Sequence, residues 1–140
     1  MNNFQLQELL EGYPVTICAA DQIKRQNGRF VIANTDTSLG PGEHWVTFYF
    51  PKRGPDEFFD SLGNAPIDYE AGFERALTKP YWMICNRLQD SNSNTCGLYC
   101  LYYVMERYGG RTMEDIVKPF LIHTLKKNDN FVKEYVINNT

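Results

Sequence analysis

Long apolar runs and a surplus of basic charge are both missing from this sequence. No stretch approaches the ~20 consecutive apolar residues of a membrane-spanning helix, and the polar start MNNFQLQELLEGYP lacks the apolar run of a signal peptide. We therefore expect a protein that stays inside a cell, is not secreted and contacts no membrane. The formal net charge is −3, whereas nucleic-acid-binding proteins usually present a basic patch, so DNA is not an expected partner.

Histidines and closely paired cysteines are also scarce. The chain has two histidines and four cysteines, and no two cysteines have the CxxC spacing that is common in zinc sites. We therefore expect no metal site and no cofactor. Three of the cysteines, Cys18, Cys85 and Cys100, are interpreted as core residues.

Apolar residues, in contrast, are plentiful enough for a substantial core. They make up 43% of the 140 residues, and nine Tyr and nine Phe predict that much of this core is aromatic. The length suits a single domain, 1–140. Runs rich in β-branched and aromatic residues predict strands at 15–19, 29–34, 44–50, 57–60 and 81–85. Helical spacing of apolar residues predicts helices at 4–11, 69–77, 96–108 and 112–125, the last interrupted near Pro119. This order is typical of an α+β fold with one small mixed or antiparallel sheet flanked by helices.

Cys96 begins the most apolar of the predicted helices, CGLYCLYYVMERY. It follows the run SNSNT (91–95), which is rich in helix-capping residues. A thiol at a helix N-terminus meets the positive end of the dipole and unpaired N–H groups, and both favour the nucleophilic thiolate. Gly97 would let a substrate backbone approach closely. The alternative is a buried structural cysteine, which is the role assigned to Cys100.

A thiolate enzyme also needs a base, and there are two candidates. His123 lies in the amphipathic stretch FLIHTLKK and is interpreted as an ordinary helix residue. His44 begins a predicted strand directly after the Gly-Pro-Gly loop at 40–42. This strand turns near 52–55 and returns to Asp60, so the hairpin brings His44 and Asp60 to the same end, where a carboxylate can orient the imidazole. Alternatively, Asp60 only begins the turn DSLGN.

Acyl transfer also needs hydrogen-bond donors for an oxyanion. Gln89 lies seven residues before Cys96, in a polar loop predicted at 87–95. Its side-chain amide and the backbone N–H of Cys96 are the candidate donors. A glutamine in a loop means nothing by itself, but the ordered set of His44, Asp60, Gln89 and Cys96 is informative.

These motifs resemble one known clan of enzymes. The segments GEHWVTFYF, FFDSLG and LQDSNSNTCGLYCLYYV are similar to those of the Ulp1/adenain clan of cysteine proteases, over roughly 30–108. The interval of seven from Gln89 to Cys96, and the patterns FDS-x-G and CG-x-x-CLY, resemble adenain-like proteases of DNA viruses, virophages and Polinton-type elements more than SUMO-type deconjugases.

The resemblance implies a role for each residue of the set. His44 matches the base, Asp60 the acidic residue, Gln89 the oxyanion donor and Cys96 the nucleophile, placed at the start of a buried helix. Trp45 matches the aromatic residue that forms a narrow channel for small substrate residues, and core packing is the alternative interpretation of this side chain. Gly97 is the second predicted substrate-binding residue. Adenovirus enzymes carry Glu where this chain has Asp60, whereas Asp is usual elsewhere in the clan.

The implied function is that of a cysteine endopeptidase for viral or mobile-element maturation, which cleaves capsid or other precursor polypeptides near glycine-like residues. The resemblance further implies a monomer in the host cytoplasm or viral factory that could be packaged in virions. Adenovirus enzymes are activated by a peptide and by DNA; an activating peptide stays open here, whereas the acidic composition argues against DNA activation.

Three other functions remain as alternatives. The first is a deconjugating protease for ubiquitin-like proteins, whose tails end in Gly-Gly. The second is a catalytically inactive binding module of the same fold. The third is an acetyltransferase that uses the same base, acidic residue and nucleophile. The lack of a clear basic cluster for binding acetyl-CoA disfavours this function.

Overall fold

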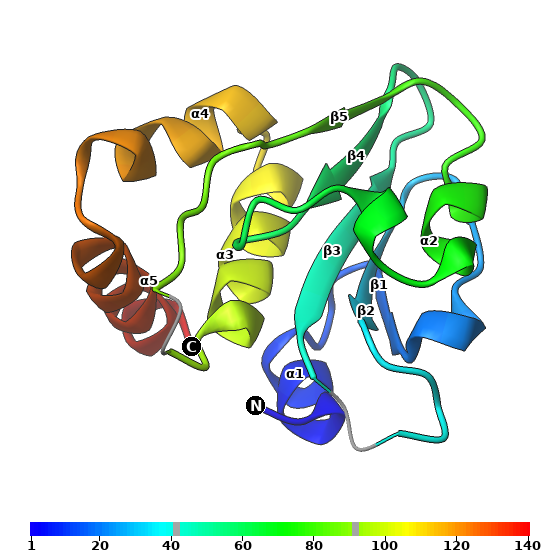
Figure 1. Cartoon of the computed structure of the whole chain (residues 1–140). Coiled ribbons are helices and arrows are strands. Elements are labelled where there is room, and N and C mark those ends of the chain that lie inside the picture. Colours follow the sequence, from blue (N-terminus) through cyan, green and yellow to red (C-terminus); the bar gives the residue numbers. More distant parts are fainter. Residues whose placement is uncertain (41–42, 91–92) are drawn as a thin grey trace.

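The computed structural model describes residues 1–40, 43–90 and 93–140 and contains one five-stranded mixed sheet with helices on both faces (Figure 1). Two parts of the predicted motifs, Pro41-Gly42 in the turn before His44 and Ser91-Asn92 in the capping run, lie outside the described residues. The elements are α1 (Asn3–Leu9), β1 (Val15–Cys18), η1 (Ala20–Gln22), β2 (Arg29–Asn34), β3 (Trp45–Phe50), β4 (Asp56–Phe59), η2 (Pro66–Asp68), α2 (Ala71–Ala76), β5 (Tyr81–Met83), α3 (Cys96–Tyr108), α4 (Met113–Val117), η3 (Lys118–Ile122) and α5 (Leu125–Asn139).

The strands follow one another across the sheet in the order β1-β2-β3-β4-β5. The outer pairs, β1 with β2 and β4 with β5, are parallel, and the inner pairs are antiparallel. The predicted α+β class with a small mixed sheet is therefore confirmed.

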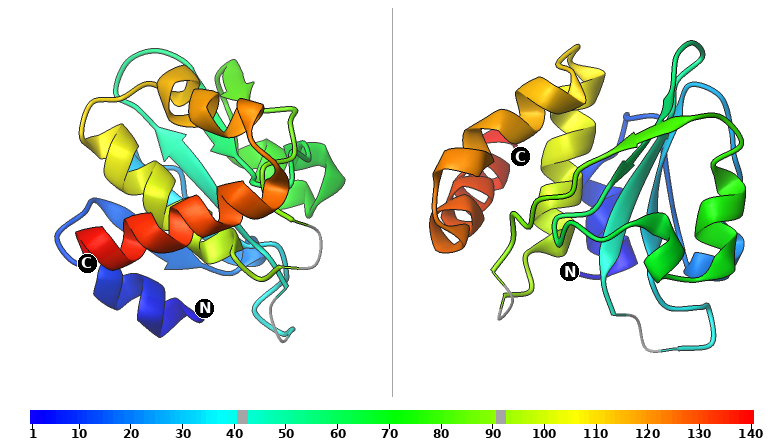
Figure 2. Two further views of the ribbon diagram at one scale, coloured as in Figure 1. Left: turned by 90° about the vertical axis from the view of Figure 1, so that its left-hand side faces the viewer. Right: turned by 45° about the horizontal axis from the view of Figure 1, so that its top comes forward.

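Alternating side chains divide the core between the two faces of the sheet, because successive residues of a strand point to opposite sides. On β2, Phe30 and Ile32 pack into a large cluster with α1, α3, α4 and α5. Val31 and Ala33 pack instead into a smaller cluster that contains Phe73 of α2. Figure 2 shows this arrangement, with α3 and α5 on one side of the sheet and α2 on the other.

The β3–β4 hairpin brings its two open ends together, as the sequence predicted. Thr47 pairs with Phe59, and continuing this register places Asp60 opposite Val46. His44 therefore lies two residues beyond the direct partner of Asp60, at the same end of the hairpin. Both residues fall just outside the strands, where side chains are free to turn toward α3.

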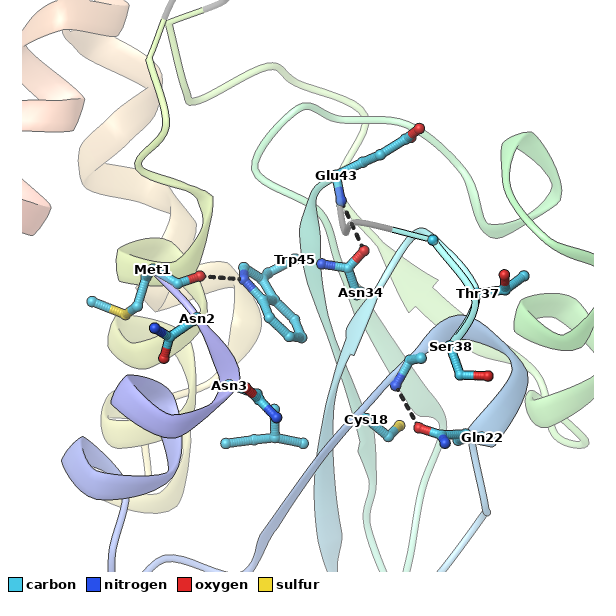
Figure 3. A pocket seen from close by; sticks show the side chains of 13 residues that line it. Met1, Asn2, Asn3, Cys18, Gln22, Asn34, Thr37, Ser38, Glu43 and Trp45 are labelled. Atoms are coloured by element: carbon cyan, nitrogen blue, oxygen red, sulfur yellow. Dashed lines mark hydrogen bonds between the residues drawn. The ribbon is translucent and has the colours of Figure 1, made fainter.

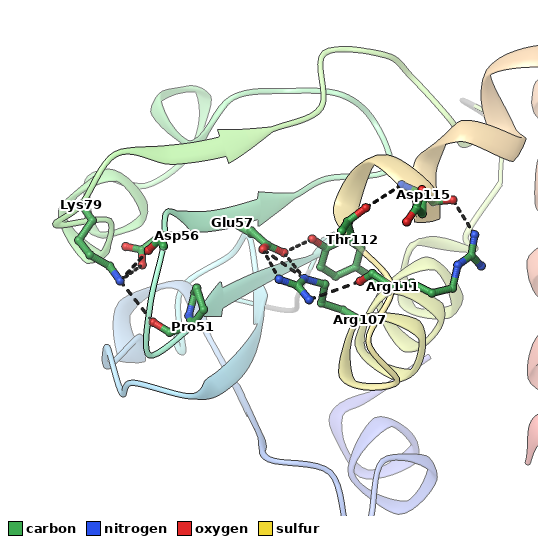
Figure 4. Close-up of polar contacts among 10 residues, drawn as sticks. Pro51, Asp56, Glu57, Lys79, Arg107, Arg111, Thr112 and Asp115 are labelled. Atoms are coloured by element: carbon green, nitrogen blue, oxygen red, sulfur yellow. Dashed lines mark hydrogen bonds and ion pairs between the residues drawn. The ribbon is translucent and has the colours of Figure 1, made fainter.

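Buried charges join β4 to its neighbours (Figure 4). Glu57 is almost fully buried and accepts hydrogen bonds from the Tyr103 hydroxyl and from Arg107, whose Nη2 lies 3.0 Å from Oε2. Both partners are on α3. The ion pair therefore fixes α3 against the sheet, and with it the helix start at Cys96.

The C-terminal third matches the prediction in part. The helix predicted at 112–125 with an interruption near Pro119 is α4 followed by η3, which begins at Lys118, and Pro119 has no N–H for a continuing α-helix. Helix α5 was not predicted at all. Its N-cap is Thr124, whose side chain accepts a hydrogen bond from the Lys127 N–H. His123, expected inside a helix, is an exposed residue of extended conformation between η3 and α5.

Two of the three cysteines assigned to the core are placed differently. Cys100 is buried as predicted, whereas Cys18 is only partly buried. The assignment of Cys85 was wrong: β5 ends at Met83, and the thiol of Cys85 is exposed. The apolar run YWMIC is longer than the strand that it forms, so its last residue passes out of the sheet.

Two further features are absent from the described ranges. None of the helices there is long and apolar enough to cross a membrane. Across the same residues, no group of three His, Cys, Asp or Glu side chains is placed to hold a metal ion.

Candidate active site

The Cys96 thiol lies at the first position of α3 and is 8% exposed. It receives hydrogen bonds from His44 and from the backbone N–H groups of Trp45 and Gly97. Burial by itself raises the pKa of a thiol, but the His44 hydrogen bond, the two backbone N–H groups and the positive charge of His44 together lower the pKa of Cys96 below its usual value. The site thus favours a thiolate.

The His44 imidazole joins this thiol to a carboxylate. Its Nε2–H donates to Asp60 Oδ1 at 2.6 Å, which leaves Nδ1 for Cys96. Burial lowers the pKa of His44, but the hydrogen bonds and negative charges of Asp60 and Cys96 outweigh burial and raise this pKa to about 9. Each partner stabilises the charged form of the other, so the two pKa shifts act together in favour of an imidazolium–thiolate pair.

The Asp60 carboxylate is itself held by two further donors. The Leu62 N–H donates to Oδ1 at 2.9 Å, and the Tyr69 hydroxyl donates to Oδ2. The backbone of Asp60 also closes the predicted turn, because the Gly63 N–H donates to its carbonyl at 2.9 Å. Asp60 therefore both contacts His44 and begins the turn, and its orienting role in catalysis stays a prediction. Tyr69 was not singled out from the sequence, since nothing in a tyrosine near a helix start indicates a contact with a carboxylate nine residues earlier.

The Gln89 side chain lies in the same site and is 3% exposed. Ser61 Oγ donates to Gln89 Oε1 at 2.6 Å, and Gln89 Nε2 donates to the Ser93 carbonyl at 3.0 Å. These two bonds fix which end of the amide is oxygen and which is nitrogen. An amide nitrogen has two N–H donors, and the Ser93 bond uses one of them. Ser61 and Ser93 are supporting residues that sequence reasoning missed.

The four predicted catalytic residues lie in or next to one cavity of about 300 Å³. His44, Gln89 and Cys96 line it directly, and Asp60 lies behind His44. The complete lining is Met1, Glu43, His44, Trp45, Leu62, Arg87, Gln89, Ser93, Asn94 and Cys96. Sequence reasoning did not identify Arg87, whose Nε donates to the Gln89 carbonyl at 2.9 Å.

The two predicted substrate-binding residues, Trp45 and Gly97, meet at Met1. The Trp45 indole N–H donates to the Met1 carbonyl at 2.9 Å (Figure 3). A Cβ placed on Gly97 would lie 3.2 Å from the Cβ of Met1, so a larger residue there would crowd it. Trp45 also packs against the larger core cluster, as the alternative interpretation of this residue predicts, and the substrate channel stays a prediction.

A second cavity of about 450 Å³ lies next to the first and shares Met1, Glu43 and Trp45 with it. Figure 3 shows side chains of its lining, among them Trp45, Cys18 and Ser38.

A low-pKa thiol, a histidine held by a carboxylate and an amide beside the thiol form a constellation suited to acyl transfer through a covalent thioester. On a mixed sheet with the thiol at a helix start, this arrangement agrees with the resemblance of the motifs to the Ulp1/adenain clan of cysteine proteases.

The chain is similar in sequence to the cysteine protease S273R from a Malawi tick isolate of African swine fever virus, with 26% identity over 145 residues that cover 94% of this chain and 51% of the relative. It is also similar to the SUMO-1 cysteine protease S273R of a South African tick isolate, with 29% identity over 119 residues, 76% of this chain and 44% of the relative. No protein-family model matches.

The crystal structure of the selenomethionine pS273R protease of the same virus has a similar fold. Its TM-score is 0.50 at 24% identity, covering 74% of this chain and 42% of that one. The chain spans about half the length of the curated relatives it matches.

Proposed function

We propose that the chain is a cysteine endopeptidase in which Cys96 is the nucleophile, His44 the base and Asp60 the residue that orients the base. The observation that carries the proposal is the pair of contacts made by one imidazole: Nε2 bonds to Asp60, and the same ring bonds to the Cys96 thiol. A cysteine that only packs in a core does not need a hydrogen bond from a histidine that is held by a carboxylate.

The proposed reaction begins with attack of the Cys96 thiolate on the scissile carbonyl carbon, which forms an S–C bond. The resulting oxyanion accepts hydrogen bonds from the Cys96 backbone N–H, which has no partner within the helix, and from Gln89. His44 gives its proton to the departing amine as the C–N bond breaks. Water then attacks the thioester, His44 takes its proton, and the carboxylate product leaves with the thiol restored.

The proposed substrates are polypeptides with small residues, such as glycine, at the cleavage site. Support comes from the cavity of about 300 Å³ beside Cys96, which Trp45 and Met1 narrow. Capsid or other structural precursors of a DNA virus or virophage are the proposed substrates with such cleavage sites. The proposed location is accordingly the host cytoplasm or viral factory, and the virion. The protein is proposed to act as a monomer without DNA. An activating peptide is compatible with the site.

Deconjugation of a ubiquitin-like protein is the second candidate, because some of the viral relatives carry the name SUMO-1 cysteine protease and a Gly-Gly tail would suit the same narrow cavity. Fluorogenic SUMO and ubiquitin substrates, compared with short glycine-containing peptides, separate the two functions.

The test is cleavage profiling of the purified protein on a peptide library, with Cys96→Ala as the matched control. We expect cuts next to small residues that disappear in the variant. Cleavage that survives in Cys96→Ala, or a wild-type protein that neither cleaves any substrate nor reacts with a vinyl-sulfone probe, would overturn the proposal and favour an inactive binding module.

A further inference from the structure

Helix α5 contributes a buried carboxylate to the loop that leads to Cys96. Asp129 is 4% exposed, and its Oδ1 accepts three hydrogen bonds: from the Tyr99 hydroxyl at 2.8 Å, from Thr95 Oγ1 at 3.2 Å and from the Asp90 N–H at 3.4 Å. Figure 2 shows α5 lying across α3, which brings Asp129 against this loop.

The preceding residue on α5 holds the other side of the same loop. Asn128 is 1% exposed, and its Nδ2 donates to the carbonyls of Leu88 and Phe120, each at 3.1 Å. The Leu88 carbonyl also accepts the Tyr99 hydroxyl at 3.1 Å. Two adjacent polar residues of α5 thus bond to the chain on both sides of Gln89.

Three of the residues that Asn128 and Asp129 contact are direct neighbours of the catalytic candidates in the sequence. Leu88 and Asp90 flank Gln89, and Thr95 directly precedes Cys96. Neither Gln89 nor Cys96 belongs to a strand, so contacts with the rest of the protein determine their separation. A carboxylate that bonds to a direct neighbour of each keeps that separation constant.

The contacts that activate the thiol come from elsewhere. The pKa of Cys96 is lowered through His44 and the backbone N–H groups of Trp45 and Gly97, and Asp129 bonds to none of these. Burying polar side chains is costly unless they are fully hydrogen-bonded. Asn128 and Asp129 are buried positions of α5, as is the apolar Val132 one turn later, and the Oδ1 of Asn128 has no hydrogen-bond partner among the described residues, so these two polar residues are not explained by core packing.

We propose that Asp129, assisted by Asn128, is a positioning residue for acyl transfer: it sets the place of the oxyanion donor Gln89 relative to Cys96 and leaves thiolate formation unaffected. The proposal rests on the acyl-transfer function proposed above. Misplacing a catalytic group by about 1 Å can cost on the order of 100-fold, so we expect Asp129→Ala to lower peptide kcat by about 10- to 100-fold with little change in KM.

The experiment compares two reactions of Cys96 in the full-length protein. Acylation by 4-nitrophenyl acetate develops an oxyanion and releases 4-nitrophenolate, whereas alkylation by iodoacetamide releases iodide without an oxyanion. Both rates are measured for the wild type, Asp129→Ala, Asp129→Asn and Val132→Ala, together with peptide cleavage and thermal unfolding. Asp129→Asn retains an acceptor oxygen and is the conservative variant. Val132→Ala disturbs the core at the same helix without touching the loop.

We expect Asp129→Ala to slow acylation and cleavage selectively, Asp129→Asn to recover part of the rate, and Val132→Ala to lower only the unfolding temperature. Unchanged acylation in a folded Asp129→Ala or Asp129→Asn protein would overturn the proposal. An equal fall of acylation and alkylation, or an equal loss in Val132→Ala, would also overturn it and indicate general loosening. If the wild type cleaves no peptide but shows this split between the two reactions, the protease function fails and the positioning role of Asp129 stands.

Discussion

Replacing Asp60 with Asn removes one negative charge from the catalytic arrangement and leaves its shape almost intact. In the structure, Oδ1 accepts from His44 and Leu62, and Oδ2 accepts from the Tyr69 hydroxyl. An asparagine can keep its oxygen toward His44 and place its NH₂ group at Tyr69, because a hydroxyl can accept as well as donate. The histidine then keeps the tautomer that places Nδ1 toward the thiol.

The expected size of the effect follows from the pKa of His44. The rise of this pKa from 6.5 to about 9 favours the imidazolium by about 3 kcal/mol, which corresponds to about 300-fold in population. Asp60 shares this effect with Cys96, so removing its charge should cost between about 10- and 300-fold in kcat/KM. In a serine-protease triad, where the change produces the wrong tautomer, the loss is about 10⁴-fold.

The assay is the pH dependence of kcat/KM for wild type and Asp60→Asn. Activity needs the thiolate and the imidazolium together, so the wild-type profile should fall as the pH rises through about 9, where His44 loses its proton. Without the Asp60 charge the pKa of His44 is lower, and this alkaline limb should move to lower pH. An unshifted limb with full activity would refute the orienting role, and a loss near 10⁴-fold would refute the argument from Tyr69.

The remaining predictions concern three other sites. Cys96→Ala should abolish turnover and leave thermal unfolding nearly unchanged, whereas Cys100→Ala should keep turnover and cost about 1–3 kcal/mol in urea unfolding; the reverse pattern would contradict the choice of nucleophile. Gln89→Ala should lower peptide kcat by about 10²-fold without slowing the alkylation of Cys96 by iodoacetamide. Measuring the peptide cleavage rate and the alkylation rate on one preparation checks this. Glu57→Gln should destabilise the fold by about 2–4 kcal/mol, since Arg107 then loses its buried ion-pair partner. A free energy of unfolding in urea equal to that of the wild type would disprove this prediction.

Local patterns were sufficient for the sheet and for the four catalytic candidates. The strand HWVTFYF, its turn and the return FFD specify a hairpin, and the geometry of a hairpin by itself places His44 near Asp60. The apolar helix beginning at Cys96 is equally plain in the sequence, and its burial against the sheet brings the thiol to the same end of the hairpin.

The supporting residues were beyond the reach of such reasoning, because they act through contacts between distant segments. Tyr69 and Ser61 meet their partners only after the chain has folded back on itself. Helix α5 was overlooked because two of its buried positions are Asn128 and Asp129, which weaken the apolar periodicity from which helices are read. Asn128 and Asp129, which weaken the apolar periodicity of this helix, are also the residues that form hydrogen bonds with the segments around Gln89 and before Cys96.

The most direct test of an activated Cys96 is the order in which the cysteines react. Brief exposure to iodoacetamide at pH 6, followed by peptide mapping in a mass spectrometer, should find label first on Cys96, although its thiol is buried and that of Cys85 is exposed. Access by itself would favour Cys85, whereas a thiolate stabilised by His44 favours Cys96. Label on Cys85 before Cys96, or equal label on both, would contradict the account.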